Sequence, residues 1–417
     1  MFKAIPKRSR LVRLRAFVRR HLHRVPLKAK RIILGAACAL TFLFLSLSLS
    51  RNLLLHAARG DFGPAVNGRY FDARFIRRAN LLWRSEPRPE HQHELWNDIK
   101  YDVVIAVKTG HEVAAKRLKN LRERGWWRVG RHVPNFLVVS DADDDGVGAI
   151  GLKKYAMDIM RDFSGTSAPS HWFEKTGWRG DKDKNLPAVH LMRTMYPHKK
   201  WYLLLDDDTY IFLENFAKHV TTPNMNDGKP VYTGKVFYIS KCGGFERDGT
   251  WAKNRSEPKG VFAHGGSGIV MNGLAVDSMY SAIPQCIKDY SSCWAGDMQV
   301  GLCLRRNGVQ MRRISTPRST GYARNFIPFS PTKAMSDRRY SRAWKSADHP
   351  LTFHKIEGRE MELVSQLERL AVAANRTVDY TSLRVHLLKN GVVPDHSPKN
   401  KKNKHYSTEF MPAHLKR

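Results

Sequence analysis

Three adjacent carboxylates, Asp206 to Asp208, are the residues in this sequence whose types and spacing most clearly allow chemistry. They follow the apolar run "WYLLL" (201–205) without a spacer, and apolar residues resume at once in "TYIFLENF". An acidic triplet is usually a solvated turn, but these flanks place it at the end of a buried strand, inside a cleft. Carboxylates this close repel one another, and a divalent cation removes that repulsion. Hard oxygen ligands suit Mg²⁺ or Mn²⁺, which also take substrate phosphates as ligands. The triplet therefore predicts a metal and diphosphate site.

Two other motifs resemble functional loops but lack a required residue. "DADDDG" (141–146) matches the start of a calcium-binding loop, yet its twelfth position is Leu152 instead of a bidentate Glu. A strand is expected before it where that loop needs a helix, so we interpret it as a turn near a nucleotide site. "GGSGI" (265–269) resembles the nucleophile elbow of serine hydrolases, but Ile269 stands where that elbow needs a glycine. Neither a calcium loop nor serine hydrolase chemistry is expected.

The segments around the triplet alternate between predicted strands and helices. Continuous apolar runs predict buried strands at 102–110, 135–141 and 201–205. Helical patterns lie between them, at 111–125, which ends at a glycine, and at 185–197, which ends at a proline. This alternation predicts an α/β fold with a doubly wound sheet in which these strands run parallel. Ligands of such sheets bind at the carboxyl ends of the strands, where the three acids lie.

The N-terminal part of the chain has the pattern of a membrane anchor. Residues 1–31 hold 12 Lys or Arg and no acid, and residues 32–50 carry no charge. Nineteen helical residues span roughly 28 Å, close to the thickness of a bilayer core. A cleaved signal peptide normally has a shorter basic region, and a buried helix normally shows a polar face. We therefore expect a cytosolic tail (1–31), a transmembrane helix (32–50) and a luminal remainder, oriented by the positive-inside bias.

The luminal remainder is predicted to contain a stem, a folded domain and a tail. Residues 51–98 lack a clear period and read as a stem, residues 99–395 as the folded domain, and residues 396–417 as a basic tail. The chain has 417 residues, is 42% hydrophobic and carries 10 Trp, so global disorder is not expected. The chain has a net charge of +33, and without the 12 basic residues of the tail the remainder still carries +21, a surplus that would favour nucleic acid in a cytosolic protein. In a lumen its partners are instead nucleotide sugars, acidic glycans or lipid headgroups, and a merely solvated basic surface is the alternative.

The luminal cysteines and two sequons agree with this placement. Cys38 lies in the predicted anchor, and the four others predict two disulfides in an oxidising compartment, with three connectivities open: Cys242, Cys286, Cys293 and Cys303. Three of these crowd into "CIKDYSSCWAGDMQVGLC", so we expect at least one disulfide to hold this segment. Asn254 and Asn375 begin acceptor sequons for N-glycosylation.

Several motifs, taken in order over roughly residues 100–356, resemble glycosyltransferase family 31, the Fringe and core-1 β1,3-galactosyltransferase group. They are "IAVKTG" (105–110), "YPHKKWYLLLDDDTYIFLENF" (196–216), "PVYTGK" (230–235), "FAHGGSGIVMN" (262–272), "GDMQVGLCLRRNGV" (296–309) and "TFHKI" (352–356). The resemblance implies a GT-A-type fold with a doubly wound mixed sheet, and metal-dependent, inverting transfer of a hexose from a UDP-sugar to a glycan hydroxyl. The expected linkage is β1,3, and galactose and N-acetylglucosamine are the favoured sugars. The resemblance further implies a Golgi or ER–Golgi membrane protein of type II, with Mn²⁺ or Mg²⁺ as cofactor, a glycan or glycoprotein acceptor, and no nucleic acid partner. A homodimer is left open.

The resemblance also implies roles for individual residues. Asp206, Asp208 and His354 correspond to the metal ligands, with Asp208 the most direct, and Asp297 corresponds to the catalytic base. The residues expected around the donor are Val107, Lys108, Thr109, Arg117, Asp141, Asp207, Gly265 and Gly266. The glycines would let the backbone approach the sugar closely.

Simpler interpretations remain open for several of these residues. Asp297 has the position of an ordinary helix-start acid, and His354 that of a partly buried core histidine. Lys108 and Arg117 fit donor phosphates or plain surface charge. The chain also departs from many relatives at Gly296, where they carry a second acid beside the base. A non-catalytic, chaperone-like or glycan-binding member of the same fold is the alternative function, although such a protein would be expected to lose the metal motif that is kept here.

Overall fold

A computed structural model of the protein describes residues 95–129, 133–164, 180–239, 260–312, 325–341, 343–345 and 348–392. The predicted cytosolic tail, membrane anchor and basic C-terminal tail lie outside these residues, as does all of the stem before residue 95. Within the described ranges, no helix combines the length and the apolar character needed to cross a bilayer.

A six-stranded mixed sheet forms the centre of the described residues, in the order β3-β2-β1-β4-β9-β6. Strands β1 to β4 run parallel, and β9 runs antiparallel to both of its neighbours, β4 and β6. The strands are β1 (Val103–Lys108), β2 (Phe136–Ser140), β3 (Ala149–Gly151), β4 (Trp201–Asp206), β6 (Tyr232–Gly234) and β9 (Ile269–Asn272). The three strands expected around the acids are thus confirmed, as are the two expected helices, which the structure places at His111–Arg124 and Asn185–Met195, with ends shifted by a residue or two.

Side chains of the central strands alternate between two hydrophobic cores, because successive residues of a strand point to opposite faces. Val103, Ile105 and Val107 of β1 join one core, and Val104 and Ala106 join the other. Strand β4 divides in the same way between its odd-numbered and even-numbered residues. The strands therefore read as continuous apolar runs because both faces of the sheet are covered.

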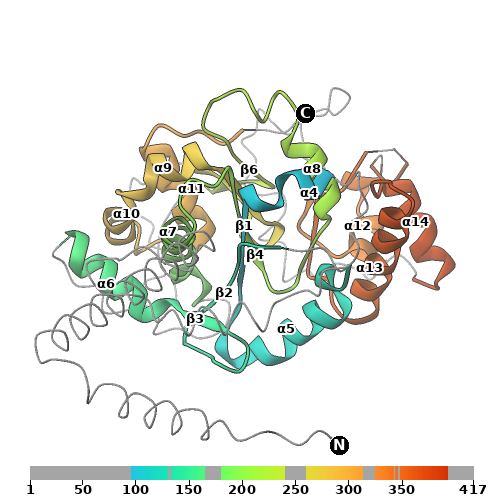
Figure 1. The fold of residues 1–417 in the computed structure, drawn as a ribbon, viewed down its shortest axis with the longest axis horizontal. Helices are drawn as coiled ribbons and strands as arrows, with labels where there is room; N and C mark the ends of the chain where they lie inside the picture. The colour runs from blue at the N-terminus through green and yellow to red at the C-terminus, as the bar shows by residue number, and fades with distance from the viewer. Residues whose placement is uncertain are drawn as a thin grey trace, which may run out of the picture. The chain divides into compact units, whose positions relative to one another are not determined.

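Helices cover both faces (Figure 1). The face that carries Val104 packs against α6 (Leu152–Ser164), α7 (Asn185–Met195), α9 (Gly273–Tyr280), α10 (Ile283–Asp289) and α11 (Gly296–Arg306). The other face packs against α4 (Leu95–Ile99), α5 (His111–Arg124), α8 (Leu213–Val220), α12 (Pro331–Ser336), α13 (Gly358–Ala373) and α14 (Tyr380–Lys389). This mixed α/β architecture, with parallel strands at its centre, fits the GT-A-like fold.

Two small sheets complete the described part. In one, β11 (Thr352–His354) pairs in parallel with β10 (Phe326–Ile327) and antiparallel with β5 (Thr209–Ile211). In the other, β7 (Val236–Ile239) pairs antiparallel with β8 (Gly260–Ala263). Because β5 begins three residues after the end of β4, the first of these sheets brings the chain near residue 354 to the acidic triplet.

A disulfide between Cys286 and Cys303 joins α10 to α11 across 17 residues of sequence. It confirms the expectation that a disulfide holds this cysteine-rich segment, and Cys293 is disulfide-bonded as well. Both sulfurs of the Cys286–Cys303 bridge lie in the core, since neither residue is exposed to solvent.

Replacing both Cys286 and Cys303 by alanine is expected to lower the free energy of unfolding by about 3 kcal/mol, because closing a loop of this length restricts the unfolded chain by about that amount. Denaturant unfolding of the purified protein measures the change. Ser278→Ala, on the exposed side of α9, is the control and should leave the midpoint unchanged. An unchanged midpoint in the double variant would show that the bridge does not stabilise the fold.

Candidate active site

Strand register places the candidate ligands at one edge of the central sheet. Lys108, the last residue of β1, is the Cα partner of Asp206, the last residue of β4. His354, the last residue of β11, is the Cα partner of Thr209 in β5. The turn that holds Asp207 and Asp208 connects β4 to β5, so the two pairings bring acids, lysine and histidine to the carboxyl ends of the parallel strands. This is the edge where ligands of such sheets bind.

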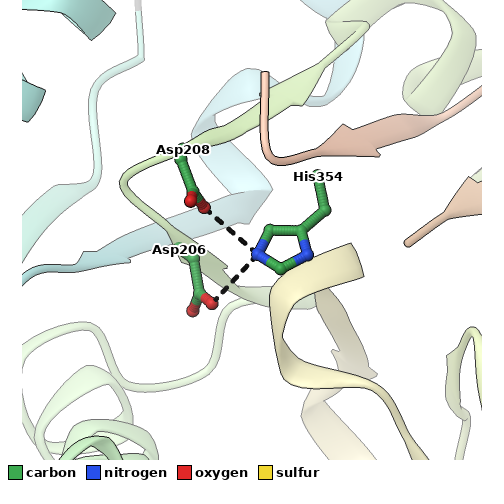
Figure 2. A group of neighbouring side chains, drawn as sticks. All are labelled: Asp206, Asp208 and His354. Atoms are coloured by element: carbon green, nitrogen blue, oxygen red, sulfur yellow. Dashed lines mark ion pairs between the residues drawn. The ribbon is translucent and has the colours of Figure 1, made fainter. Parts of the chain in front are cut away.

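Asp206, Asp208 and His354 form a group whose ligand atoms all lie within 4.8 Å of one another (Figure 2). Nε2 of His354 lies 3.2 Å from Oδ1 of Asp208 and 3.7 Å from Oδ2 of Asp206. Oδ1 of Asp208 is buried yet takes part in no hydrogen bond. Two carboxylates and one imidazole, with one of the carboxylate oxygens buried and not hydrogen-bonded, fit a divalent cation such as Mn²⁺ or Mg²⁺. The structure thus gathers the three predicted metal ligands.

Lys108 is the counter-ion of this group. Its side chain is buried, and its Nζ lies 2.9 Å from Oδ1 of Asp206 and 2.8 Å from Oδ2 of Asp181. Burial alone would raise the pKa of the Asp206 carboxyl, but the charges of Lys108 and His354 outweigh it and lower that pKa to about 2. The two carboxylates likewise outweigh burial at Lys108 and raise its pKa. Lys108, which was expected to contact the donor phosphates, therefore lies between the carboxylates of Asp206 and Asp181 and pairs with both.

Asp207 points away from the metal group, into the polar pair formed by Thr109 and Arg117. Oγ1 of Thr109 donates to Oδ2 of Asp207 at 2.6 Å, and Nη1 of Arg117 donates to Oδ1 at 2.8 Å. Arg117 also lies 3.7 Å from Oδ2 of Asp208. Burial raises the pKa of the Asp207 carboxyl to about 6, although both hydrogen bonds act in the opposite direction. Arg117 keeps 38% of its side chain exposed and so retains donors for an anionic ligand.

The glycine turn, formed by Gly265 and Gly266, packs tightly between His354 and Asp297. A Cβ on Gly266 would lie 2.2 Å from Cε1 of His354, and a Cβ on Gly265 would lie 3.1 Å from Cβ of Asp297. Oγ1 of Thr209 donates to the carbonyl oxygen of Gly266 at 2.7 Å, which fixes the turn against β5. The sequence pattern predicted glycines that leave room for a sugar. The structure shows that Gly266 leaves room for the histidine.

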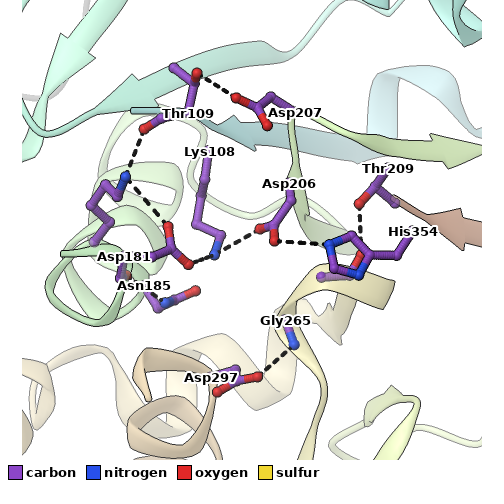
Figure 3. Close-up of polar contacts among 12 residues, drawn as sticks. Lys108, Thr109, Asp181, Asn185, Asp206, Asp207, Thr209, Gly265, Asp297 and His354 are labelled. Carbon is purple, nitrogen blue, oxygen red and sulfur yellow. Dashed lines mark hydrogen bonds and ion pairs between the residues drawn. The ribbon is translucent and has the colours of Figure 1, made fainter. Parts of the chain in front are cut away.

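Asp297 lies in the first turn of α11 and faces this glycine turn (Figure 3). Its Oδ2 accepts the N–H of Gly265 at 2.8 Å, and its Oδ1 accepts the N–H of Met298 at 2.9 Å. Burial raises the pKa of the carboxyl to about 6, and the two N–H groups and Lys108 limit that rise. Each oxygen keeps a second lone pair, so the oriented carboxylate is able to accept a proton from a hydroxyl group near neutral pH.

The remaining predicted donor residues lie around the ends of β1 and β2. Val107 is buried in the core, so only its backbone is available to a ligand. Asp141 follows β2, accepts the N–H of His111 at 3.0 Å, and lies 3.8 Å from Nζ of Lys184. Three of the acids of "DADDDG" accept backbone N–H groups, as Asp143 does from Gly151 at 2.7 Å, which agrees with a turn.

Sequence reasoning missed the short segment that opens α7. Asp181, in the 3₁₀ helix Asp181–Asp183, pairs with Lys108 and lies 3.4 Å from Nζ of Lys184. Nζ of Lys184 donates to the carbonyl oxygen of Thr109 at 2.8 Å. The only sequence signal was a charged cluster, "GDKDK", ahead of the predicted helix, and such a cluster is more often a solvated face.

The structure gives a steric reason for the glycine at position 296. A Cβ there would lie 2.1 Å from Nδ2 of Asn185 and 2.4 Å from the carbonyl oxygen of Lys182. No side chain fits at this position while the segment before α7 packs against α11. The second acid that the resemblance leads one to expect beside Asp297 is therefore excluded by packing in this chain.

Comparison with known proteins agrees with this arrangement. The family model described as Fringe-like matches residues 99–364, which include every residue of the candidate site. The comparison with curated proteins gave no match. Because the family match covers more than half of the chain, this protein belongs to the Fringe-like family of glycosyltransferases.

Proposed function

We propose that this protein transfers a hexose from a UDP-sugar to a hydroxyl group of a glycan, with inversion at the anomeric carbon and in β1,3 linkage. Galactose and N-acetylglucosamine are the sugars proposed. The observation that supports this most is the placement of Asp297 across the Gly265–Gly266 turn from the Asp206, Asp208 and His354 group. A base and a diphosphate site on either side of one glycine turn suit a sugar bound between them.

Inverting transfer requires a base for the acceptor hydroxyl, and Asp297 suits that role. The N–H groups of Gly265 and Met298 orient its carboxylate, and its pKa of about 6 leaves it mainly deprotonated at neutral pH. As the acceptor oxygen attacks the anomeric carbon, its proton passes to Asp297, and UDP leaves from the opposite face of the sugar.

The opposite side of the site suits the departing diphosphate. Asp206, Asp208 and His354 would hold a divalent cation, which supplies Lewis-acid stabilisation of the charge on the leaving group. Lys108 keeps Asp206 deprotonated, and Arg117 orients Asp207 while retaining free donors for phosphate oxygens. No covalent intermediate on the protein is needed.

Release of UDP from a panel of UDP-sugars tests the proposal. The purified protein with Mn²⁺ should release UDP from one donor well above the others, faster when a glycan acceptor is added, and a chelator should abolish the release. A protein that releases no UDP from any donor with any acceptor, yet binds glycans or unfolded client proteins, would support the glycan-binding or chaperone-like alternative.

We further propose a single-pass type II protein of the Golgi or ER–Golgi membranes, anchored by residues 32–50. The basis is the excess of basic residues before an uncharged stretch of membrane-spanning length. The C-terminus should resist protease in sealed microsomes and become sensitive when detergent opens them. A C-terminus digested in intact microsomes would reverse the proposed topology.

A further inference from the structure

Asp181 has a place in the site that the proposed reaction does not yet use. Its Oδ2 lies 2.8 Å from Nζ of Lys108, whose ammonium group also contacts Asp206 at 2.9 Å (Figure 3). Its Oδ1 lies 3.4 Å from Nζ of Lys184. Although two lysines contact it, 33% of its side chain stays exposed to solvent. Asp181 is thus a fixed carboxylate with lone pairs still available to a ligand.

Asp181 is linked both to the proposed diphosphate position and to Asp297. Through Lys108 it is connected to Asp206, at the proposed diphosphate position. Its charge also acts on Asp297: burial is the main cause of the raised pKa of Asp297, and Asp181 adds to that rise. A sugar that is attached to the diphosphate and reacts beside Asp297 would therefore lie on the side of the site to which Asp181 belongs.

The segment that carries Asp181 is held by Asn185 and by the absence of a side chain at Gly296. Nδ2 of Asn185 donates to the carbonyl oxygen of Asp181 at 3.0 Å. The same nitrogen occupies the space that a Cβ on Gly296 would need. The fold therefore excludes a side chain at position 296 and places the 181–185 segment against the start of α11.

Asn185 supplies an independent sign of a missing ligand. The residue is 1% exposed, and its Oδ1 has no hydrogen-bond partner. Leaving a buried acceptor unpaired is unfavourable, and such atoms are rare in native proteins. Asn185 lies between Asp181, whose carbonyl oxygen it contacts, and the start of α11, which carries Asp297 (Figure 3).

We propose that Asp181 is a sugar-binding residue of the donor subsite, whose carboxylate accepts hydrogen bonds from hydroxyl groups of the transferred hexose, with Asn185 and Gly296 as positioning residues. The proposal rests on the UDP-sugar activity proposed above. An ionised carboxylate accepts hydrogen bonds but cannot donate them. It therefore favours the hydroxyl groups of the sugar over the anionic phosphates. Asp181 thereby distinguishes UDP-hexose from UDP.

Calorimetry with UDP and with UDP-galactose or UDP-N-acetylglucosamine, in the presence of Mn²⁺, tests this role. Asp181→Asn should lower the affinity for the preferred UDP-sugar about 10- to 100-fold, since hydrogen bonds to charged groups are in this range. The affinity for UDP should stay within about 3-fold of that of the unmodified protein, because Asn keeps an acceptor for Lys108. Asp289→Asn, an exposed partner of Arg306, is the matched control and should change neither affinity.

The outcomes separate the inference from the function on which it rests. Equal losses for UDP and for the UDP-sugar would mean that Asp181 acts only through Lys108 on the diphosphate side, and would overturn the inference. Unchanged UDP-sugar affinity would overturn it too. In both cases the proposed transferase function would stand if the unmodified protein turns over the donor, and it would fail if that protein binds no UDP-sugar at all.

Gly296→Ala tests the positioning role. Its Cβ would collide with the backbone oxygen of Lys182 as well as with Asn185, so the 181–185 segment must move. The variant should lose UDP-sugar affinity and keep UDP affinity, and trimming Asn185 to alanine should not restore the loss, because the clash with Lys182 remains. Gly146→Ala, whose Cβ would meet only the side chain of Asp144, is the control. Full UDP-sugar affinity in a folded Gly296→Ala protein would contradict the positioning role.

Discussion

Asp297→Asn should lower the rate of sugar transfer by about 10²- to 10⁴-fold, the usual loss when general-base assistance is removed. Asparagine has nearly the same size, but its amide cannot take the proton of the acceptor hydroxyl. The proposed metal ligands are other residues, so the affinities for Mn²⁺ and for UDP should hold. Product formation under single-turnover conditions and calorimetry with UDP measure the two effects separately.

The alternative is that Asp297 only stabilises the start of its helix, and a matched control variant distinguishes this role from that of the base. Glu112 is also an acid in the first turn of a helix, α5, and is exposed. Glu112→Gln removes the same kind of favourable charge at a helix N-terminus and should leave transfer unchanged. If Asp297→Asn transfers sugar at a normal rate, Asp297 is not the base.

The pH dependence of the rate gives an independent reading of the same group. Burial raises the pKa of the Asp297 carboxyl to about 6, and the base must be deprotonated. The value of kcat/KM should therefore rise with pH through about 6 and level off above about 7. Asp297→Asn should remove this rise, and a rise that persists in the variant would assign it to another group.

Asp208→Asn should fail in a different way, by losing Mn²⁺ and UDP affinity together. Asp208 is one of the three proposed ligands of a cation that would also bind the diphosphate. Loss of one of three protein ligands should weaken both affinities strongly, and activity should recover partly at high Mn²⁺ concentration. The fold should persist because the residue lines the site and its size is almost unchanged. Calorimetric titrations with Mn²⁺, and with UDP at fixed Mn²⁺, measure the losses.

Asp277→Asn is the control for this variant. Asp277 pairs with Arg193 on the surface at α9, so the change alters charge by the same amount without touching the site. Its affinities should equal those of the unmodified protein. Normal Mn²⁺ and UDP affinities in Asp208→Asn would mean that the acidic triplet has another purpose than holding a cation.

The central strands, the helices between them and the position of the acids after β4 could be predicted, because the local sequence pattern determines all three. Strands β1, β2 and β4 are buried on both faces, so they read as unbroken apolar runs, and the acids after β4 interrupt that pattern visibly. The motif resemblance added His354 and Asp297 to the predicted site, although no local pattern connects them with Asp206 and Asp208.

The interactions within the site could not be predicted, because they depend on contacts between distant segments. Lys108 had the appearance of a phosphate ligand, and only its register with Asp206 and its contact with Asp181 show that it is a buried counter-ion. Gly266 carries no sign in the sequence that His354 would fill the space beside it. Asp181 lies in a charged run that resembles a solvated surface, and its place in the site follows from how α7 packs against α11.

The register of two strand pairs makes this site sensitive to chain length as well as to residue type. Lys108 meets Asp206, and His354 meets Thr209, because each pair is aligned across its ladder. One residue inserted into β4 or β11 would turn every later side chain of that strand to the opposite face. A variant with such an insertion or deletion would keep all the site residues in its sequence and still lose the site. Insertions at 221–230, between α8 and β6, would leave both alignments intact.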